Sequence, residues 1–184
     1  MSYTVYPSAG RKTVQWSGGT STEIFVFPAD GDFATRNFDF RISTATVEVE
    51  ETDFTFFEGI TRHLMILKGT LELNHIDRYA KTLTPYDQDT FSGEWPTKSK
   101  GKVTDFNLML KNGYTGSLEH IQLKRQSLQL LHESDDDFVF IAEGEAEISG
   151  RRIVSGDLVK FDESLSIGAT AEVQLIRIRV LNPA

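Results

Sequence analysis

Residues 64–73 read LMILKGTLEL: four apolar residues, a turn at Lys68-Gly69, and then Leu71 and Leu73 alternating with polar residues. A similar stretch, VFIAEGEAEI, occupies residues 139–148 and has its turn at Gly144. The two glycines are 144 − 69 = 75 positions apart. Both stretches are typical of a β-hairpin whose first strand is buried and whose second strand exposes one face.

A second pair of positions indicates an internal duplication. Asp87 is followed by Phe91, and Asp157 by Phe161, at an offset of 157 − 87 = 70. Any two hairpins share a general pattern, but two linked matches in the same order favour duplication. The sequence therefore predicts two closely packed domains of similar fold, residues 12–110 and 111–182.

The remaining apolar runs also indicate strands. Residues 103–110 read as one strand, and near the C-terminus Ile176, Ile178 and Val180 alternate with arginines. Turn signals such as Asn112-Gly113 recur about every ten residues, which is typical of an antiparallel sandwich or barrel. A change of parity between Ile42 and Val47, near Ala45-Thr46, predicts a bulge or bend in a long strand. We expect an all-β fold.

Composition narrows the classes of function. The 184 residues include 19 Lys and Arg against 27 Asp and Glu, so the net charge of −8 argues against nucleic-acid partners and a basic membrane-binding patch. The absence of cysteine excludes disulfides, Cys-ligated zinc and thiol catalysis. The first residues lack the basic and apolar regions of a signal peptide, which favours a cytoplasmic location. Nothing in the sequence indicates the oligomeric state.

Several short motifs resemble known families. Residues 156–161, GDLVKF, resemble the cupin superfamily of small jelly-roll barrels. Residues 16–24 (WSGGTSTEI), 40–45 (FRISTA), 54–64 (FTFFEGITRHL) and 105–109 (DFNLM) together resemble the HutD/Ves family. The resemblance implies a bicupin, which is two antiparallel jelly-roll barrels related by duplication. It also implies a regulatory role in bacterial histidine utilisation, without an established enzymatic activity.

The cupin resemblance also identifies where a metal would bind. Metal cupins place an acidic ligand seven residues before the glycine of the first motif, and here that position holds Arg62 in the first half and Asp137 in the second. In the second half His132 occupies a ligand position, but the positions where the other histidine ligands are expected hold Leu130 and Val159. We therefore expect no bound metal and no cofactor, and we interpret the acidic run at residues 135–137 as a solvated turn.

Arg62 changes the expected chemistry of the first barrel. A guanidinium is always charged and binds a carboxylate through two parallel hydrogen bonds, so it can replace a metal in binding an anion. Asn107 lies between Phe106 and Leu108, which predicts that its side chain faces the barrel interior. Arg41 lies between Phe40 and Ile42, so its side chain is expected on the opposite side of the strand from theirs. Trp16, Thr20 and Thr22 flank a Gly-Gly turn where hydroxyl groups could orient a polar ligand. The predicted ligand-binding residues are Arg62, Asn107, Arg41, Trp16, Thr20 and Thr22.

Alternatives remain open for each part of this site. Arg62 could instead form a structural ion pair with Glu58 or Asp105, and Trp16 could pack on the core. The favoured hypothesis is a small-carboxylate binder that is not an enzyme. The competing hypothesis is an isomerase or hydrolase that uses acid–base groups such as Glu58 or His63.

Overall fold

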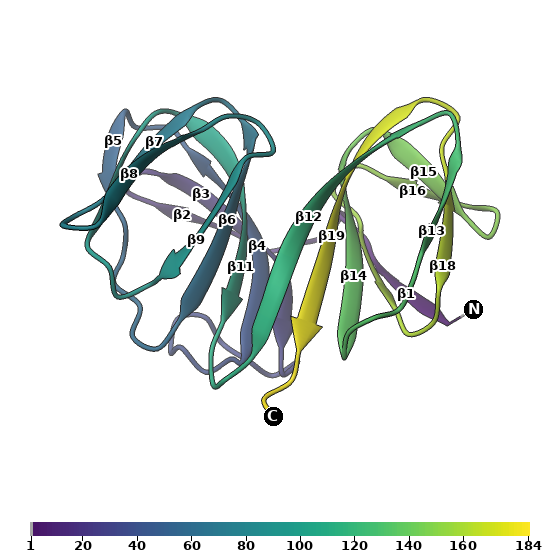
Figure 1. The fold of residues 1–184 in the computed structure, drawn as a ribbon, viewed down its shortest axis with the longest axis horizontal. Coiled ribbons are helices and arrows are strands. Elements are labelled where there is room, and N and C mark those ends of the chain that lie inside the picture. The colour runs from purple at the N-terminus through teal and green to yellow at the C-terminus, as the bar shows by residue number, and fades with distance from the viewer. Residues whose placement is uncertain (1) are drawn as a thin grey trace. The chain divides into compact units, whose positions relative to one another are not determined.

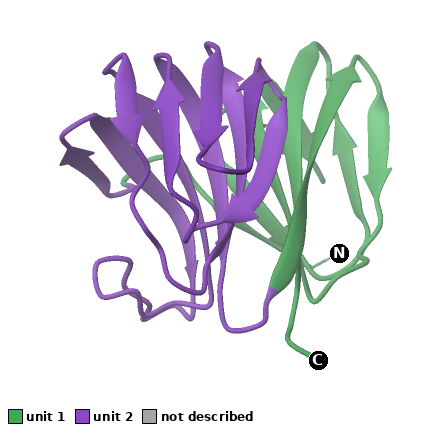
Figure 2. Cartoon of the chain, turned by 60° about the vertical axis from the view of Figure 1, so that its left-hand side comes forward, with its two compact units in different colours: residues 1–10, 115–184 green, residues 11–114 purple. Residues whose placement is uncertain are grey.

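The structure is a computed structural model, and it describes residues 2–184. These residues form strands and turns, with β-strands running from β1 to β19, and they include no helix that could cross a membrane. Every strand pairing is antiparallel, so the prediction of an all-β antiparallel fold is confirmed. The chain divides into two compact units (Figure 2). We call them the N-terminal unit, Arg11–Tyr114, and the C-terminal unit, Met1–Gly10 with Thr115–Ala184.

The N-terminal unit contains two sheets, and most of their strands are labelled in Figure 1. The larger sheet has the order β2 (Thr13–Trp16), β3 (Gly19–Phe27), β4 (Phe40–Val47), β11 (Val103–Leu110), β6 (Thr61–Lys68), β9 (Gln88–Ser92). The smaller sheet has the order β5 (Glu51–Asp53), β10 (Thr97–Lys100), β7 (Leu71–His75), β8 (Tyr79–Leu83).

The C-terminal unit also contains two sheets. The larger has the order β1 (Tyr3–Tyr6), β17 (Leu158–Phe161), β14 (Asp136–Glu143), β19 (Glu172–Leu181), β12 (Thr115–Lys124). The smaller has the order β13 (Ser127–Leu130), β18 (Leu165–Gly168), β15 (Glu145–Ile148), β16 (Arg151–Val154). Because β1 pairs with β17, the start of the chain belongs to this unit, although it lies outside both predicted domain ranges.

Each unit buries an apolar core between its two sheets. In the N-terminal unit that core includes Leu64 and Ile66 of the larger sheet and Leu71 and Leu73 of the smaller one. The opposite face of β4 is buried as well, since Phe40 and Ile42 are fully buried. This explains why the predicted bulge in β4 is absent: β4 pairs with β11 without interruption, and both of its faces carry apolar residues.

The two units share several local features. β6 and β14 are both eight residues long, and the glycines that follow them, Gly69 and Gly144, both have φ of +86°. The amide of Ile66 donates to the carbonyl of Asp87 over 3.0 Å, and the amide of Ile141 donates to that of Asp157 over 3.0 Å. These features fit hairpins of the same construction in both units.

The turn at Gly69 gives a first testable prediction. Its positive φ costs any L-residue about 1–2 kcal/mol, and a Cβ there would lie 2.4 Å from the carbonyl oxygen of Lys102. Gly59 is a matched control, because its φ is +65° but a Cβ would meet nothing within 4 Å. We expect Gly69→Ala to lower the free energy of unfolding by about 2–5 kcal/mol and Gly59→Ala by about 1–2 kcal/mol. Equal losses in urea unfolding would contradict this account.

Candidate functional site

The larger sheet of the N-terminal unit brings together three of the predicted site residues. Arg41 and Arg62 both lie opposite Met109 in the strand register, and Asn107 lies two residues further along β11. Residues directly opposite one another in a sheet face the same side. Arg41, Asn107 and Arg62 therefore share the face that carries Leu64 and Ile66, which points into the unit.

Arg62 is a buried cation without a direct counter-ion. Its side chain is 7% exposed, and its Nη2 donates to Oδ1 of Asn107 over 2.8 Å. The Nδ2 of Asn107 donates in turn to Oδ1 of Asp105, so the amide separates the guanidinium from the carboxylate. Among residues 2–184 no carboxylate lies within ion-pair distance of Arg62, and its Nε has no hydrogen-bond partner. Glu58, the other candidate partner, is exposed.

Aromatic rings surround the Arg62 guanidinium. Its Cζ lies 4.7 Å from the ring centroid of Phe54, 5.4 Å from that of Phe91 and 5.7 Å from that of Phe57. Burial lowers the pKa of Arg62 to about 10, an effect that the charge of Asp105 opposes and that of Arg41 reinforces. Cation–π contacts stabilise the charge only partly, so the site would gain from an anion.

A second buried guanidinium lies in the same row of the sheet. Arg41 donates from Nε to Glu23 over 2.8 Å and from Nη1 to the hydroxyl of Ser43 over 2.8 Å. Its Cζ lies 4.1 Å from the Phe33 centroid. Desolvation lowers the pKa of Arg41, although Glu23 opposes this, and the charge of Arg36 lowers it further.

Arg36 adds a third positive charge. Its Cζ lies 4.5 Å from the ring centroids of both Phe33 and Phe57. These two rings are the ones that contact Arg41 and Arg62, so guanidinium groups and aromatic rings alternate through this end of the unit. Such a concentration of cations in a protein of net charge −8 indicates a local preference for anions.

Asp105 reduces the positive charge only in part. Burial raises its pKa to about 7, while the charge of Arg62 and the hydrogen bond from Asn107 oppose the rise. Near neutral pH this carboxyl is therefore only partly ionised, so it offsets only part of the charge of Arg62.

The other predicted residues lie elsewhere. Thr22 pairs with Thr44 rather than with Ser43, so Thr20 and Thr22 lie on the opposite face of the sheet from Arg41. The Thr22 hydroxyl lies 2.8 Å from that of Thr13. Trp16 is 39% exposed, and its ring covers Gly18, where a Cβ would lie 2.1 Å from the indole. The structure does not bring these three residues to Arg62.

A polar cluster that the sequence did not indicate spans the two sheets of the N-terminal unit. His75 is 1% exposed, with Nε2 at 3.0 Å from Oδ2 of Asp89 and Nδ1 at 2.7 Å from the hydroxyl of Thr97. The Tyr79 hydroxyl donates to the same carboxylate over 3.1 Å. Burial and the charge of Asp89 raise the pKa of Tyr79 to about 12. In contrast, His63 lies on the opposite face of β6 from Arg62, and burial lowers its pKa.

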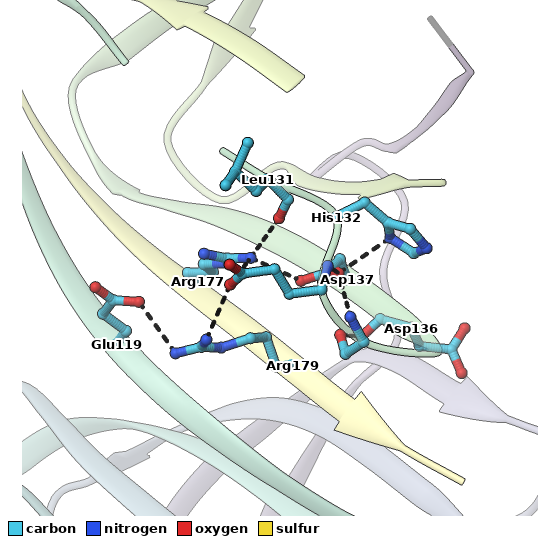
Figure 3. A network of polar contacts seen from close by, with 9 residues as sticks. Glu119, Leu131, His132, Asp136, Asp137, Arg177 and Arg179 are labelled. Atoms are coloured by element: carbon cyan, nitrogen blue, oxygen red, sulfur yellow. Dashed lines mark hydrogen bonds and ion pairs between the residues drawn. The ribbon is translucent and has the colours of Figure 1, made fainter. Parts of the chain in front are cut away.

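The acidic run at residues 135–137 is not a solvated turn, so that interpretation was wrong. Asp137 is fully buried and Asp136 is 8% exposed. Strand β14 begins at Asp136, so the two side chains point to opposite faces of the sheet, where Asp136 pairs with Lys160 and Asp137 with Arg177. Asp137 lies 3.0 Å from His132 and 3.3 Å from Arg177 (Figure 3). Among residues 2–184, no group of three or more His, Asp or Glu side chains is arranged to hold a metal ion.

Comparison with known proteins places the chain in a family. The HutD family model matches residues 8–176. The chain belongs to the HutD family. A structure titled as a conserved protein of unknown function, PA5104 from Pseudomonas aeruginosa PAO1, has a TM-score of 0.84 at 18% identity and covers 99% of this chain and 100% of that chain. HutD from Pseudomonas fluorescens SBW25 has a TM-score of 0.78 at 20% identity, covering 98% and 100%.

A more distant similarity shows that the HutD fold is cupin-like. The bacterial pirin YhhW from Escherichia coli, in complex with nickel(II), has a TM-score of 0.73 at 11% identity and covers 100% of each chain. Counted seven residues back from Gly69, the position where the cupin resemblance implies an acidic metal ligand holds Arg62. Because a guanidinium repels a divalent cation and donates no lone pair, the residues present do not fit a metal.

Proposed function

We propose that this HutD-family protein binds a small carboxylate in its N-terminal unit without a metal, as a regulator linked to histidine utilisation. The observation that carries the proposal is Arg62, a buried guanidinium that has, within the described residues 2–184, an unpartnered Nε and no carboxylate at ion-pair distance. A buried charge is costly unless it is paired. A carboxylate could accept from Nε and Nη2 together, which is the geometry that arginine offers best. The link to histidine utilisation rests on the family name.

Asn107 and Arg41 would assist Arg62. Asn107 fixes the guanidinium through the 2.8 Å bond to Nη2, and Arg41 adds positive charge from β4, on the other side of β11. The Phe54 and Phe57 rings cover the guanidinium, so a ligand must displace them to reach Nε. Residues 54–60 contain no strand, and the loop is held by backbone bonds such as that from Phe57 to Gly93 over 2.8 Å.

We further propose that the two units arose by duplication as a bicupin. The supporting observations are the equal lengths of β6 and β14 and the equal φ of Gly69 and Gly144. The strand register is also the same in both units. Arg62 lies opposite Phe91, and Asp137, which is 75 positions after Arg62, lies opposite Phe161.

Substitution of Arg62 tests the binding proposal. A charge-assisted hydrogen bond is worth about 1.5–3 kcal/mol, so we expect Arg62→Ala to weaken acetate or formate binding by about ten- to a hundredfold. Arg62→Lys should recover only part of the affinity, since the planar fork is lost. Arg62→Met keeps an unbranched side chain between the rings, and it separates loss of charge from loss of packing. Calorimetric titration measures these affinities.

Two controls define the outcome. Arg152→Ala removes an exposed arginine paired with Glu145 and should leave carboxylate affinity unchanged. Acetamide, which is uncharged, should bind far more weakly than acetate. If Arg62→Ala lowers the melting temperature but leaves acetate affinity at the wild-type value, Arg62 is a structural residue and the proposal is wrong.

A further inference from the structure

The C-terminal unit contains a buried polar pair at the place in its sheet that Arg62 and Asn107 occupy in the N-terminal unit. Asn107 lies opposite Leu64, two residues from Arg62, and Arg177 lies opposite Val139, two residues from Asp137. In both units the guanidinium Nη2 donates across the strands to Oδ1 of its partner, over 2.8 Å to Asn107 and 3.3 Å to Asp137. In the N-terminal unit the arginine lies on β6 and its amide partner on β11. In the C-terminal unit the partner is a carboxylate on β14, and the arginine lies on the adjacent strand β19.

Hydrogen-bond donors surround the Asp137 carboxylate on both oxygens (Figure 3). Oδ2 accepts from the backbone amides of Glu133 over 2.8 Å and Ser134 over 3.0 Å, and Nδ1 of His132 lies 3.0 Å away. Oδ1 accepts from Arg177. Two adjacent backbone amides with a guanidinium form the kind of concave donor set that binds a free carboxylate. Asp137 therefore occupies a complete carboxylate receptor made by its own chain.

Arg177 offers a carboxylate more hydrogen-bond donors than Asp137 uses. Its side chain is 7% exposed, and Nη2 also donates to the carbonyl of Leu131 and to Glu133. Within residues 2–184, Nε has no hydrogen-bond partner. An aspartate anchored in β14 reaches only Nη2, whereas a free carboxylate could bind Nη2 and Nε together. The unpartnered Nε is thus a second, independent indication of a carboxylate site.

We propose that Asp137 is an intramolecular ligand, which fills a carboxylate-binding site formed by Arg177, His132 and the amides of Glu133 and Ser134. Once the Asp137 side chain is removed, the same donors bind a free carboxylate of the size of formate or acetate. The N-terminal unit has no such internal ligand, because its corresponding residue is Arg62. The occupancy of the Arg177 site does not depend on whether Arg62 binds a ligand.

Chemical rescue of Asp137→Ala tests this proposal. Breaking one side of a buried ion pair should lower the melting temperature of the variant by about 6–20 °C. Sodium formate at 10 to 100 times its dissociation constant should then restore about 3–10 °C, while equal sodium chloride should not. The shift is taken relative to wild-type protein at the same formate concentration, so any binding at Arg62 contributes equally to both.

Two further variants locate the rescue. Asp137→Ala with Arg177→Gln should no longer respond to formate beyond the wild-type shift. Asp135→Ala removes an exposed neighbour that accepts only from the amide of Asn182, and it should show no formate-specific stabilisation. If Asp137→Ala does not accumulate as folded protein, its refolding yield from urea with and without formate reports the same effect. An equal response to formate and chloride, or rescue that persists without Arg177, would overturn the proposal.

Discussion

Replacement of Asp89 by alanine should lower the free energy of unfolding by about 3–5 kcal/mol, because it leaves His75 buried without its acceptor. The Asp89 carboxylate accepts from Tyr79 and lies 3.0 Å from Nε2 of His75. The Thr97 hydroxyl lies within hydrogen-bond distance of both Nδ1 of His75 and the carbonyl of Trp95. Loss of the Asp89 carboxylate therefore leaves Nε2 of His75 buried without its partner, while Nδ1 keeps Thr97.

The control is the exposed lysine on the same carboxylate. The Lys81 side chain is 43% exposed and lies 3.4 Å from Asp89, so Lys81→Ala should cost less than about 1 kcal/mol. Replacing both His75 and Asp89 with leucine should cost less than Asp89→Ala alone, since no imidazole is then left buried without its partner. Urea unfolding measures all three variants. A loss for Asp89→Ala no greater than that for Lys81→Ala would show that the pair contributes little.

Much of the fold could be predicted because strand periodicity and glycine turns are local signals. The predicted strand over residues 103–110 coincides with β11, and Leu71 and Leu73 face the core while Glu72 and Asn74 are exposed. The prediction of a bulge in β4 was wrong. The parity of the apolar residues shows which face of a strand is buried only when the other face is exposed to solvent. Here both faces are buried.

The site could be predicted only where apolar neighbours fixed the direction of a polar side chain. Arg41 and Asn107 each lie between two apolar residues, and both are buried as expected. Arg177 lies in the same kind of pattern, yet a cation that alternates with isoleucines is more often solvated. Its burial becomes favourable only through partners 40 to 46 residues earlier, which are Asp137 on the neighbouring strand, Glu133 and the carbonyl of Leu131. His75 was missed for the same reason, since Asp89 belongs to the other sheet.

Asp105 should make the stability of the protein fall as pH rises from about 4 to about 7. Its pKa is raised from 3.8 to about 7 in the folded state, so the folded protein holds a proton that the unfolded chain releases in this range. The stability that the protonated form contributes is full below the unfolded pKa and is lost as pH rises through the folded pKa. At about 1.4 kcal/mol per pKa unit, the change is on the order of 4 kcal/mol.

Asp105→Asn isolates this effect, because other carboxylates titrate alike in the variant and the wild type. The amide cannot ionise, so the difference in unfolding free energy between the two proteins should grow in favour of the variant from pH 4 to pH 7 and then level off. Carboxylate affinity gives a second readout: an ionised Asp105 competes with an anion for the field of Arg62, so wild-type affinity for acetate should fall between pH 6 and pH 8. The variant should lose this dependence. If the two proteins keep parallel stability profiles over this range, Asp105 is ionised throughout, and the positive charge at Arg62 is already balanced within the fold.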